Sequence, residues 1–242
     1  MIKAIRLFLG LIYLILSCTI GIIYCLFRPF YGGNTLFLGR ILSFGMLPIM
    51  GIKIHVEGRE NFEKIQGPAI ILSNHQDNMD LFLVGAFVSK KTVSIGKKII
   101  KYFPFIGQIY WLSGNILIDR KRKKKALGAM NQAGEQMIKK GIKVWIMPEG
   151  TRSRGRGLLP FKKGAFHLAH QTKLPIINVS FSSYAKHWDI SKAQAHHVYV
   201  KIDEPMVFKP EEYPEPNELK EICEAKIKEN IALVDKKAGY TQ

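Results

Sequence analysis

Two short segments hold the residue types in this chain that are best suited to chemistry. The first is Asn-His-Gln-Asp-Asn-Met-Asp at 74–80, in which Asp80 follows His75 by five residues. An imidazole can remove a proton, and a carboxylate bonded to one ring nitrogen fixes the tautomer that leaves the other nitrogen free to do so. The segment therefore predicts a general base, His75, with an orienting carboxylate, Asp80.

The second segment is Pro-Glu-Gly-Thr-Arg-Ser at 148–153. Gly150 offers exposed backbone amides, and Arg152 beside it offers a planar, forked guanidinium that suits a phosphate. This segment predicts a phosphate clamp. Taken alone, it is also consistent with a solvated basic loop or with an Arg-Gly contact to nucleic acid.

Both segments follow continuous apolar runs, 69–72 and 143–147, which we expect to be buried strands. Sites in α/β proteins lie where strands end and helices begin. Side chains five residues apart on a straight helix point about 140° away from each other, so His75 and Asp80 can pair only if the residues between them leave the helix. We therefore expect a turn over 74–78, with Asp80 in the first turn of a helix.

The chain beyond residue 53 alternates short β-branched runs with amphipathic stretches. This pattern is typical of an α/β fold, here with a mixed central sheet flanked by helices. Strands are expected at 53–57, 69–72, 92–95, 115–118, 143–147, 175–181 and 197–202, and helices at 79–88, 126–140, 165–171 and 217–236. Because 242 residues with 47% hydrophobic content can bury one sizeable core, we expect a single catalytic domain over 53–242.

The first 52 residues are strongly apolar. Residues 7–27 carry no charge and would form a helix about 31 Å long, enough to cross a bilayer. A second apolar stretch at 36–52 is interrupted by Arg40 and Pro48. We expect a membrane anchor of two helices over 1–52, either one span plus an interfacial helix or two helices within one leaflet. The alternative is that both helices merely cap a soluble core.

The formal net charge of +17, from 36 Lys and Arg against 19 Asp and Glu, implies an anionic partner. Nucleic acid, anionic lipid headgroups and an acidic carrier protein all qualify. The basic run at 120–125 is interpreted as a solvated helix start near lipid headgroups rather than a nucleic-acid patch. Three scattered cysteines indicate no disulfide framework. His167 and His170 can share a helix face, but no third ligand accompanies them, so we expect no metal site.

Two further motifs accompany the opening pair. One combines Gly-Lys-Lys at 96–98, Pro-Phe-Ile-Gly at 104–107 and Gly-Asn-Ile-Leu-Ile-Asp-Arg at 114–120, and the other is Leu-Pro-Ile-Ile at 174–177. In their order along the chain, 74–80, 96–120, 148–153 and 174–177, the four blocks strongly resemble the glycerolipid acyltransferase family. Members of this family share a His-x-x-x-x-Asp motif and a later Pro-Glu-Gly-Thr-Arg-Ser motif. By size and by its apolar N-terminus, the chain is most similar to the bacterial members that act on 1-acylglycerol 3-phosphate.

The resemblance implies an O-acyltransferase of phospholipid biosynthesis. It would transfer a fatty acyl group from a thioester of acyl carrier protein or coenzyme A to the sn-2 hydroxyl of lysophosphatidic acid, giving phosphatidic acid. His75 would take the hydroxyl proton, and Asp80 would hold the imidazole. Attack would be direct, since no Ser or Cys lies in a nucleophile motif. No metal or cofactor is needed beyond the thioester co-substrate.

The resemblance also implies a substrate-binding set. Its members are Lys97, Glu149, Gly150, Thr151 and Arg152. Lys97 and Arg152 would clamp the acceptor phosphate, Gly150 would let it approach, and Glu149 would either orient the glycerol backbone or support Arg152. Asn74 and nearby backbone amides are candidates for stabilising the oxyanion.

Apolar residues within the span of the second block are candidates for lining an acyl tunnel, although such a stripe is more often ordinary core. They are Phe103, Phe105, Ile109 and Trp111. The expected partners are membrane lipids, lysophosphatidic acid and the thioester donor, without nucleic acid. The expected location is the inner or cytoplasmic membrane, with the catalytic domain facing the cytosol.

Two alternatives remain open from the sequence. The same transfer could use another acceptor, such as glycerol 3-phosphate or an amino-acid lysolipid. A non-enzymatic alternative is a basic module that binds membrane surfaces or nucleic acid, which predicts salt-dependent binding that survives loss of His75.

Overall fold

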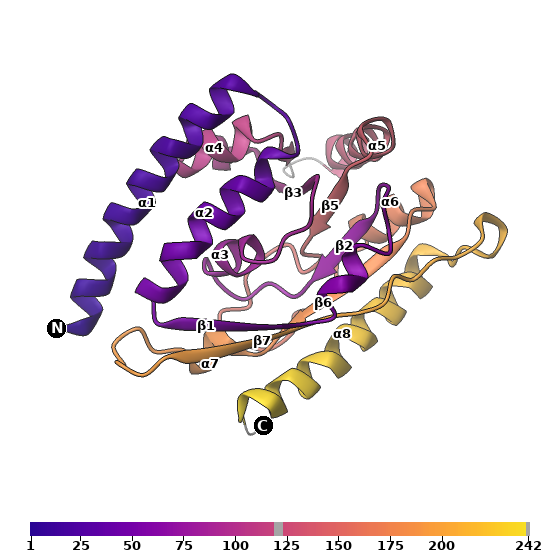
Figure 1. The fold of residues 1–242 in the computed structure, drawn as a ribbon. Coiled ribbons are helices and arrows are strands. Elements are labelled where there is room, and N and C mark those ends of the chain that lie inside the picture. Colours follow the sequence, from indigo (N-terminus) through magenta and orange to yellow (C-terminus); the bar gives the residue numbers. More distant parts are fainter. Residues whose placement is uncertain (119–122, 241–242) are drawn as a thin grey trace.

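A mixed sheet of seven strands forms the centre of the protein, seen in a computed structural model that describes residues 1–118 and 123–240 (Figure 1). The strand order is β1-β7-β6-β2-β5-β3-β4. Only the β6–β7 pair is antiparallel, so β6, β2, β5, β3 and β4 all run in one direction. The strands are β1 Ile52–Glu57, β2 Ile70–Ser73, β3 Thr92–Lys97, β4 Ile116–Ile118, β5 Lys143–Ile146, β6 Ile176–Phe181 and β7 His196–Ile202.

All seven predicted strands are confirmed, with ends that differ from the prediction by at most two residues. Four predicted helices are also present, as α3 Asp80–Gly85, α5 Lys123–Lys140, α6 Gly164–Thr172 and α8 Pro216–Ala238. The helices α4 Ile106–Leu112 and α7 Tyr184–His187 are not predicted, because helices of one or two turns are too short to show a full amphipathic period. Residues 119–120 of the second block and the side chains of the basic run at 120–125 lie outside the described residues.

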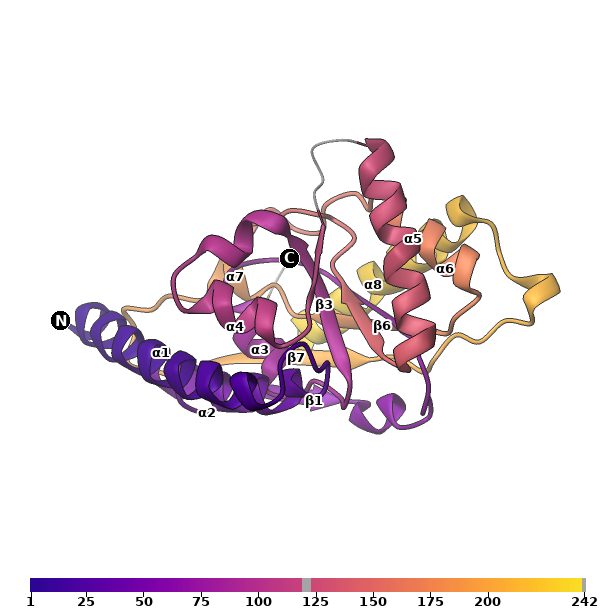
Figure 2. The same ribbon diagram turned by 90° about the horizontal axis from the view of Figure 1, so that it is seen from above.

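Both faces of the sheet are covered, as expected for parallel strands (Figure 2). Side chains alternate between the faces. Ile71 and Trp145 belong to one core cluster, together with residues of the N-terminal helices and α3. Ile70 and Val144 belong to a second cluster, together with residues of α5, α6 and α8. The central strand β2 is buried along its whole length, which fixes the position of the residues that follow it.

The N-terminal helices α1 Ile2–Phe27 and α2 Asn34–Ile49 lie against one side of the α/β core (Figures 1 and 2). Helix α2 packs on α3 so closely that a Cβ atom on Gly39 would lie 2.9 Å from the Cα atom of Gly85. Helix α1 turns a face of mostly small residues inward, including Gly10, Ser17 and Gly21. Thus the first 52 residues share a hydrophobic core with the rest of the chain.

The opposite face of α1 is apolar and exposed, with Phe8 at 65% and Leu16 at 58% exposure. Among the described residues, α1 is the one helix long and apolar enough to cross a membrane, judged by length and composition. The shorter α2 contains Pro48 near its end. The two helices therefore combine both sequence interpretations: one side packs on the core, and another side presents apolar surface.

Candidate active site

The first chemical segment leaves β2 as an irregular turn, and α3 begins at Asp80. His75 Nδ1 lies 2.6 Å from Asp80 Oδ2, so the predicted pairing across non-helical residues is confirmed. The bond assigns the Nδ1 proton to the contact with the carboxylate and leaves Nε2 as the basic nitrogen. The His75 side chain is 21% exposed, which allows a reactant to reach it.

The carboxylate of Asp80 is held by several donors. Oδ2 also accepts from the backbone amides of Gln76 at 2.7 Å and Asp77 at 3.1 Å, and Oδ1 accepts from the hydroxyl of Tyr184 at 2.6 Å. Only 2% of the Asp80 side chain is exposed. Because hydrogen bonds to a charged acceptor are strong and directional, these contacts fix the orientation of the carboxylate toward His75.

The Asn74 side chain bonds the backbone at the end of β6. Its Nδ2 donates to the carbonyl of Phe181 at 3.0 Å, and its Oδ1 accepts from the amide of Phe181 at 2.9 Å. Both polar ends of the side chain are therefore used to join the end of β2 to the end of β6. The Asn74 side chain therefore positions the turn, with one of its two N–H groups donated to the Phe181 carbonyl.

The second chemical segment follows β5, the neighbour of β2, so the carboxyl ends of the two parallel strands meet at one edge. Backbone amides of this loop donate to the first segment, Ser153 to the carbonyl of His75 at 2.8 Å and Arg154 to that of Gln76 at 3.0 Å. Gly150 adopts a φ of +68°, which favours glycine, and its amide donates to Met147. The structure thus joins the two predicted segments directly.

Glu149 is buried beneath this junction. Its Oε1 accepts from the amide of His75 at 2.5 Å and its Oε2 from the amide of Leu159 at 2.9 Å. Each oxygen of this carboxylate has a backbone partner, and among the described residues Glu149 forms no ion pair with Arg152. Burial raises the pKa of Glu149 to about 7, although the two amides oppose the rise.

A pH-dependent contribution to stability follows from the raised pKa of Glu149. The carboxyl of Glu149 ionises near pH 4.5 in the unfolded chain and only near pH 7 in the folded protein. The contribution of Glu149 to the free energy of unfolding therefore falls as pH rises from 4.5 to about 7, and it is constant above pH 7. We expect the melting temperature of the wild type, relative to Glu149→Gln, to decrease over that interval. An increase would contradict the assignment, and Glu212→Gln, on the exposed surface, should show no such trend.

Lys97, Thr151 and Arg152 all have exposed side chains near the same edge of the sheet. Val93 of β3 and Ile70 of β2 both pair with Val144. Lys97 lies four residues beyond Val93 and Asn74 four residues beyond Ile70, so Lys97 is level with the turn that contains His75. Two strand spacings separate them, about 10 Å. Within the described part of the chain, neither Lys97 nor Arg152 pairs with a carboxylate. Both cations are therefore available to an anion.

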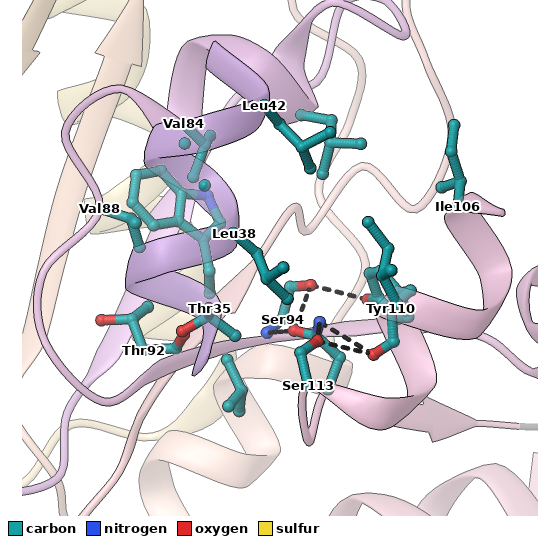
Figure 3. A pocket seen from close by; sticks show the side chains of 17 residues that line it. Thr35, Leu38, Leu42, Val84, Val88, Thr92, Ser94, Ile106, Tyr110 and Ser113 are labelled. Atoms are coloured by element: carbon teal, nitrogen blue, oxygen red, sulfur yellow. Dashed lines mark hydrogen bonds between the residues drawn. The ribbon is translucent and has the colours of Figure 1, made fainter. Parts of the chain in front are cut away.

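An apolar cavity lies between α2, α3, α4 and β3 (Figure 3). Leu38 and Leu42 line it from α2, and Val84 and Val88 line it from α3 and the residues that follow. One of the lining residues, Leu81, directly follows Asp80 in α3.

A polar cluster lies in one part of this cavity wall (Figure 3). The hydroxyl of Ser94 lies 2.7 Å from that of Tyr110 and 3.0 Å from Asn115 Oδ1. Of the four aromatic and apolar residues suggested for a tunnel, only Ile109 lines the cavity. Phe103, Phe105 and Trp111 are 55%, 43% and 47% exposed.

The fold and the site agree with comparisons to known proteins. The family model named Acyltransferase matches residues 53–182, and the chain belongs to this acyltransferase family. It is 38% identical over 235 residues to the 1-acyl-sn-glycerol-3-phosphate acyltransferase of Escherichia coli (strain K12), covering 97% of this chain and 95% of that protein. The enzyme of the same name from Haemophilus influenzae is 36% identical over 236 residues, covering 97% of each chain.

A solved structure shows the same fold. The crystal structure of the 1-acyl-sn-glycerophosphate acyltransferase from Thermotoga maritima superposes with a TM-score of 0.69, covers 96% of this chain and 98% of its own, and is 24% identical. In the part of the chain that the structure describes, no group of three or more His, Cys, Asp or Glu side chains is placed to hold a metal ion.

Proposed function

We propose that this protein transfers a fatty acyl group from a thioester to the sn-2 hydroxyl of 1-acylglycerol 3-phosphate, forming phosphatidic acid. The observation that carries the proposal is the 2.6 Å contact between His75 and the buried carboxylate of Asp80. The backbone of His75 is also bonded to the loop that carries Arg152. Relatives that match over nearly the whole chain carry this activity in their names.

The reaction uses His75 first as a base and then as an acid. Nε2 takes the proton of the acceptor hydroxyl while the oxygen attacks the thioester carbonyl, and Asp80 stabilises the imidazolium that forms. Collapse of the tetrahedral intermediate breaks the carbon–sulfur bond, and the imidazolium returns the proton to the thiolate. The step needs no acyl-enzyme, metal or prosthetic group.

Lys97 and Arg152 bind the acceptor phosphate in this proposal. They approach the site from the ends of two adjacent strands, β3 and β5, and a guanidinium can donate two parallel hydrogen bonds to a phosphate. The thioester's acyl chain occupies the apolar cavity beside α3, one of whose lining residues, Leu81, directly follows Asp80. Coenzyme A and acyl carrier protein are both anionic donors that suit a net charge of +17.

The experiment that tests acceptor recognition is Arg152→Ala. The variant loses a charge-assisted contact, so we expect the KM for lysophosphatidic acid to rise about 10- to 100-fold. Arg154→Ala, two residues away in the same loop, is the matched control and should change it much less. Assays with glycerol 3-phosphate and with 1-monoacylglycerol complete the panel. An equal rise in KM for acceptors with and without a phosphate in Arg152→Ala would contradict a phosphate-binding role.

The exposed apolar face of α1 supports attachment of the protein to a membrane, on the cytosolic side where both thioester donors are found. The double variant Phe8→Asp, Leu16→Asp places charges on this face, where the two side chains are 65% and 58% exposed. Its co-sedimentation with anionic phospholipid vesicles should be at least about 10-fold weaker. Ile138→Asp, on the exposed surface of α5, is the control and should bind as the wild type does. Unchanged binding of the α1 variant would contradict the anchor.

A further inference from the structure

Tyr184 lies far from both chemical segments in the sequence and next to them in the structure. It is fully buried, and its hydroxyl donates to Asp80 Oδ1 at 2.6 Å. The contact joins α7, which follows β6, to the first residue of α3. The arrangement is specific to tyrosine. A phenylalanine would fill the same space in the core, but it could not donate a hydrogen bond to Asp80.

The donors around Asp80 are unequally shared between its two oxygens. Oδ2 accepts from His75 Nδ1 and from the amides of Gln76 and Asp77. Among the described residues, Oδ1 accepts from Tyr184 alone. Without that hydroxyl, one oxygen of a buried carboxylate has no partner, which is costly, and the carboxylate is held through Oδ2 alone, so its rotation is less restricted.

The segment that carries Tyr184 is itself fixed on both sides. Asp235 of α8 accepts from the amide of Ser183 at 2.5 Å and from its hydroxyl at 2.7 Å. The Gln76 side chain, from the catalytic turn, donates to the carbonyl of Ser182 at 2.8 Å and accepts from the amide of Ala185 at 3.2 Å. Tyr184 is therefore held in register with the turn that contains His75.

We propose that Tyr184 is a positioning residue of the catalytic pair: its hydroxyl holds the Asp80 carboxylate in the orientation that accepts from His75 and stabilises the imidazolium during acyl transfer. This inference rests on the proposed function of His75 and Asp80. Burial, followed by the neighbouring charge of Asp80, raises the pKa of Tyr184 well above its usual value, so the hydroxyl remains a donor at every pH at which the base can work.

The test is Tyr184→Phe, which removes one oxygen and keeps the ring. We expect kcat to fall about 10- to 100-fold, the loss of one hydrogen bond to a charged group, while the KM for lysophosphatidic acid is unchanged. Tyr213→Phe is the matched control, because Tyr213 is also buried and donates to a carbonyl, that of Leu174, at 2.7 Å. Melting temperatures of both variants show that they are folded at the assay temperature.

A double-mutant comparison separates positioning from general structure. If Tyr184 acts through Asp80, Tyr184→Phe should have little further effect in an Asp80→Asn background. Wild-type kcat in Tyr184→Phe, a loss matched by Tyr213→Phe, or fully additive losses would each overturn the inference. These outcomes differ from failure of the proposed function, in which the wild type itself forms no phosphatidic acid or does not depend on His75.

Discussion

His75→Ala is expected to lower kcat for acyl transfer by about 10²- to 10⁴-fold, the usual contribution of a positioned general base. The reason is geometric as well as chemical. His75 Nδ1 is already bonded to Asp80 Oδ2, and the backbone of His75 is fixed by Glu149 and Ser153. Alanine keeps those backbone contacts and removes only the imidazole, so lysophosphatidic acid should still bind with nearly the wild-type KM.

The control for this substitution is His167→Ala, because His167 is exposed on α6 and lies outside the site. It should retain wild-type kcat. Retention of wild-type kcat by His75→Ala would show that another group takes the hydroxyl proton, and the mechanism would then be wrong. The expected behaviour of the His75 variant is acceptor binding close to that of the wild type with a kcat about 10²- to 10⁴-fold lower.

Asp80→Asn should lower kcat by about 10³-fold or more, as replacement of the carboxylate in an imidazole–carboxylate pair does elsewhere. An amide nitrogen in place of Oδ2 would meet three donors, the imidazole Nδ1 and the amides of Gln76 and Asp77. If the amide rotates, its nitrogen meets the hydroxyl of Tyr184 instead. In either orientation the variant loses the negative charge that stabilises the imidazolium.

The kcat of Asp80→Asn is compared with that of Asp189→Asn, in which a fully exposed carboxylate that bonds Ser191 is changed. The latter should have wild-type kcat. A loss in Asp80→Asn no larger than in Asp189→Asn would show that the 2.6 Å contact has no part in the reaction.

The sequence predicted the sheet well because its central strands are continuous apolar runs. Residues 70–73 are all buried, and parallel strands covered on both faces have this composition. It failed for α4 and α7, which are too short to repeat a helical pattern. It also could not show how α1 and α2 are used, since an apolar helix packs on a core or on lipid by the same surface.

Within the site, His75 and Asp80 were recognisable because both lie in one segment whose spacing excludes a regular helix. Asn74 and Glu149 were harder to interpret, because an amide or carboxylate at a strand end can face a substrate or a backbone. The structure shows that both bond the backbone, at Phe181, His75 and Leu159. Glu149 joins the two loops, and Asn74 joins the end of β2 to the end of β6.

Tyr184 was missed altogether. It is 104 residues from Asp80 in the sequence, and no local motif connects the two. One signal was present: Ser182, Ser183 and Tyr184 are polar residues that follow the buried strand β6, at the edge where β2 and β5 also end. Recognising it required the strand order, which a single sequence does not supply.

The most direct test of the account is an assay of purified protein in detergent with a long-chain acyl thioester and lysophosphatidic acid. We expect one free thiol for each molecule of phosphatidic acid, measured by thiol titration and mass spectrometry on the same samples, and both products formed at least about 100-fold more slowly with His75→Ala. Equal rates for wild type and His75→Ala, or thiol release from the wild type without phosphatidic acid, would contradict the assignment of His75 as the base that transfers the acyl group to this acceptor.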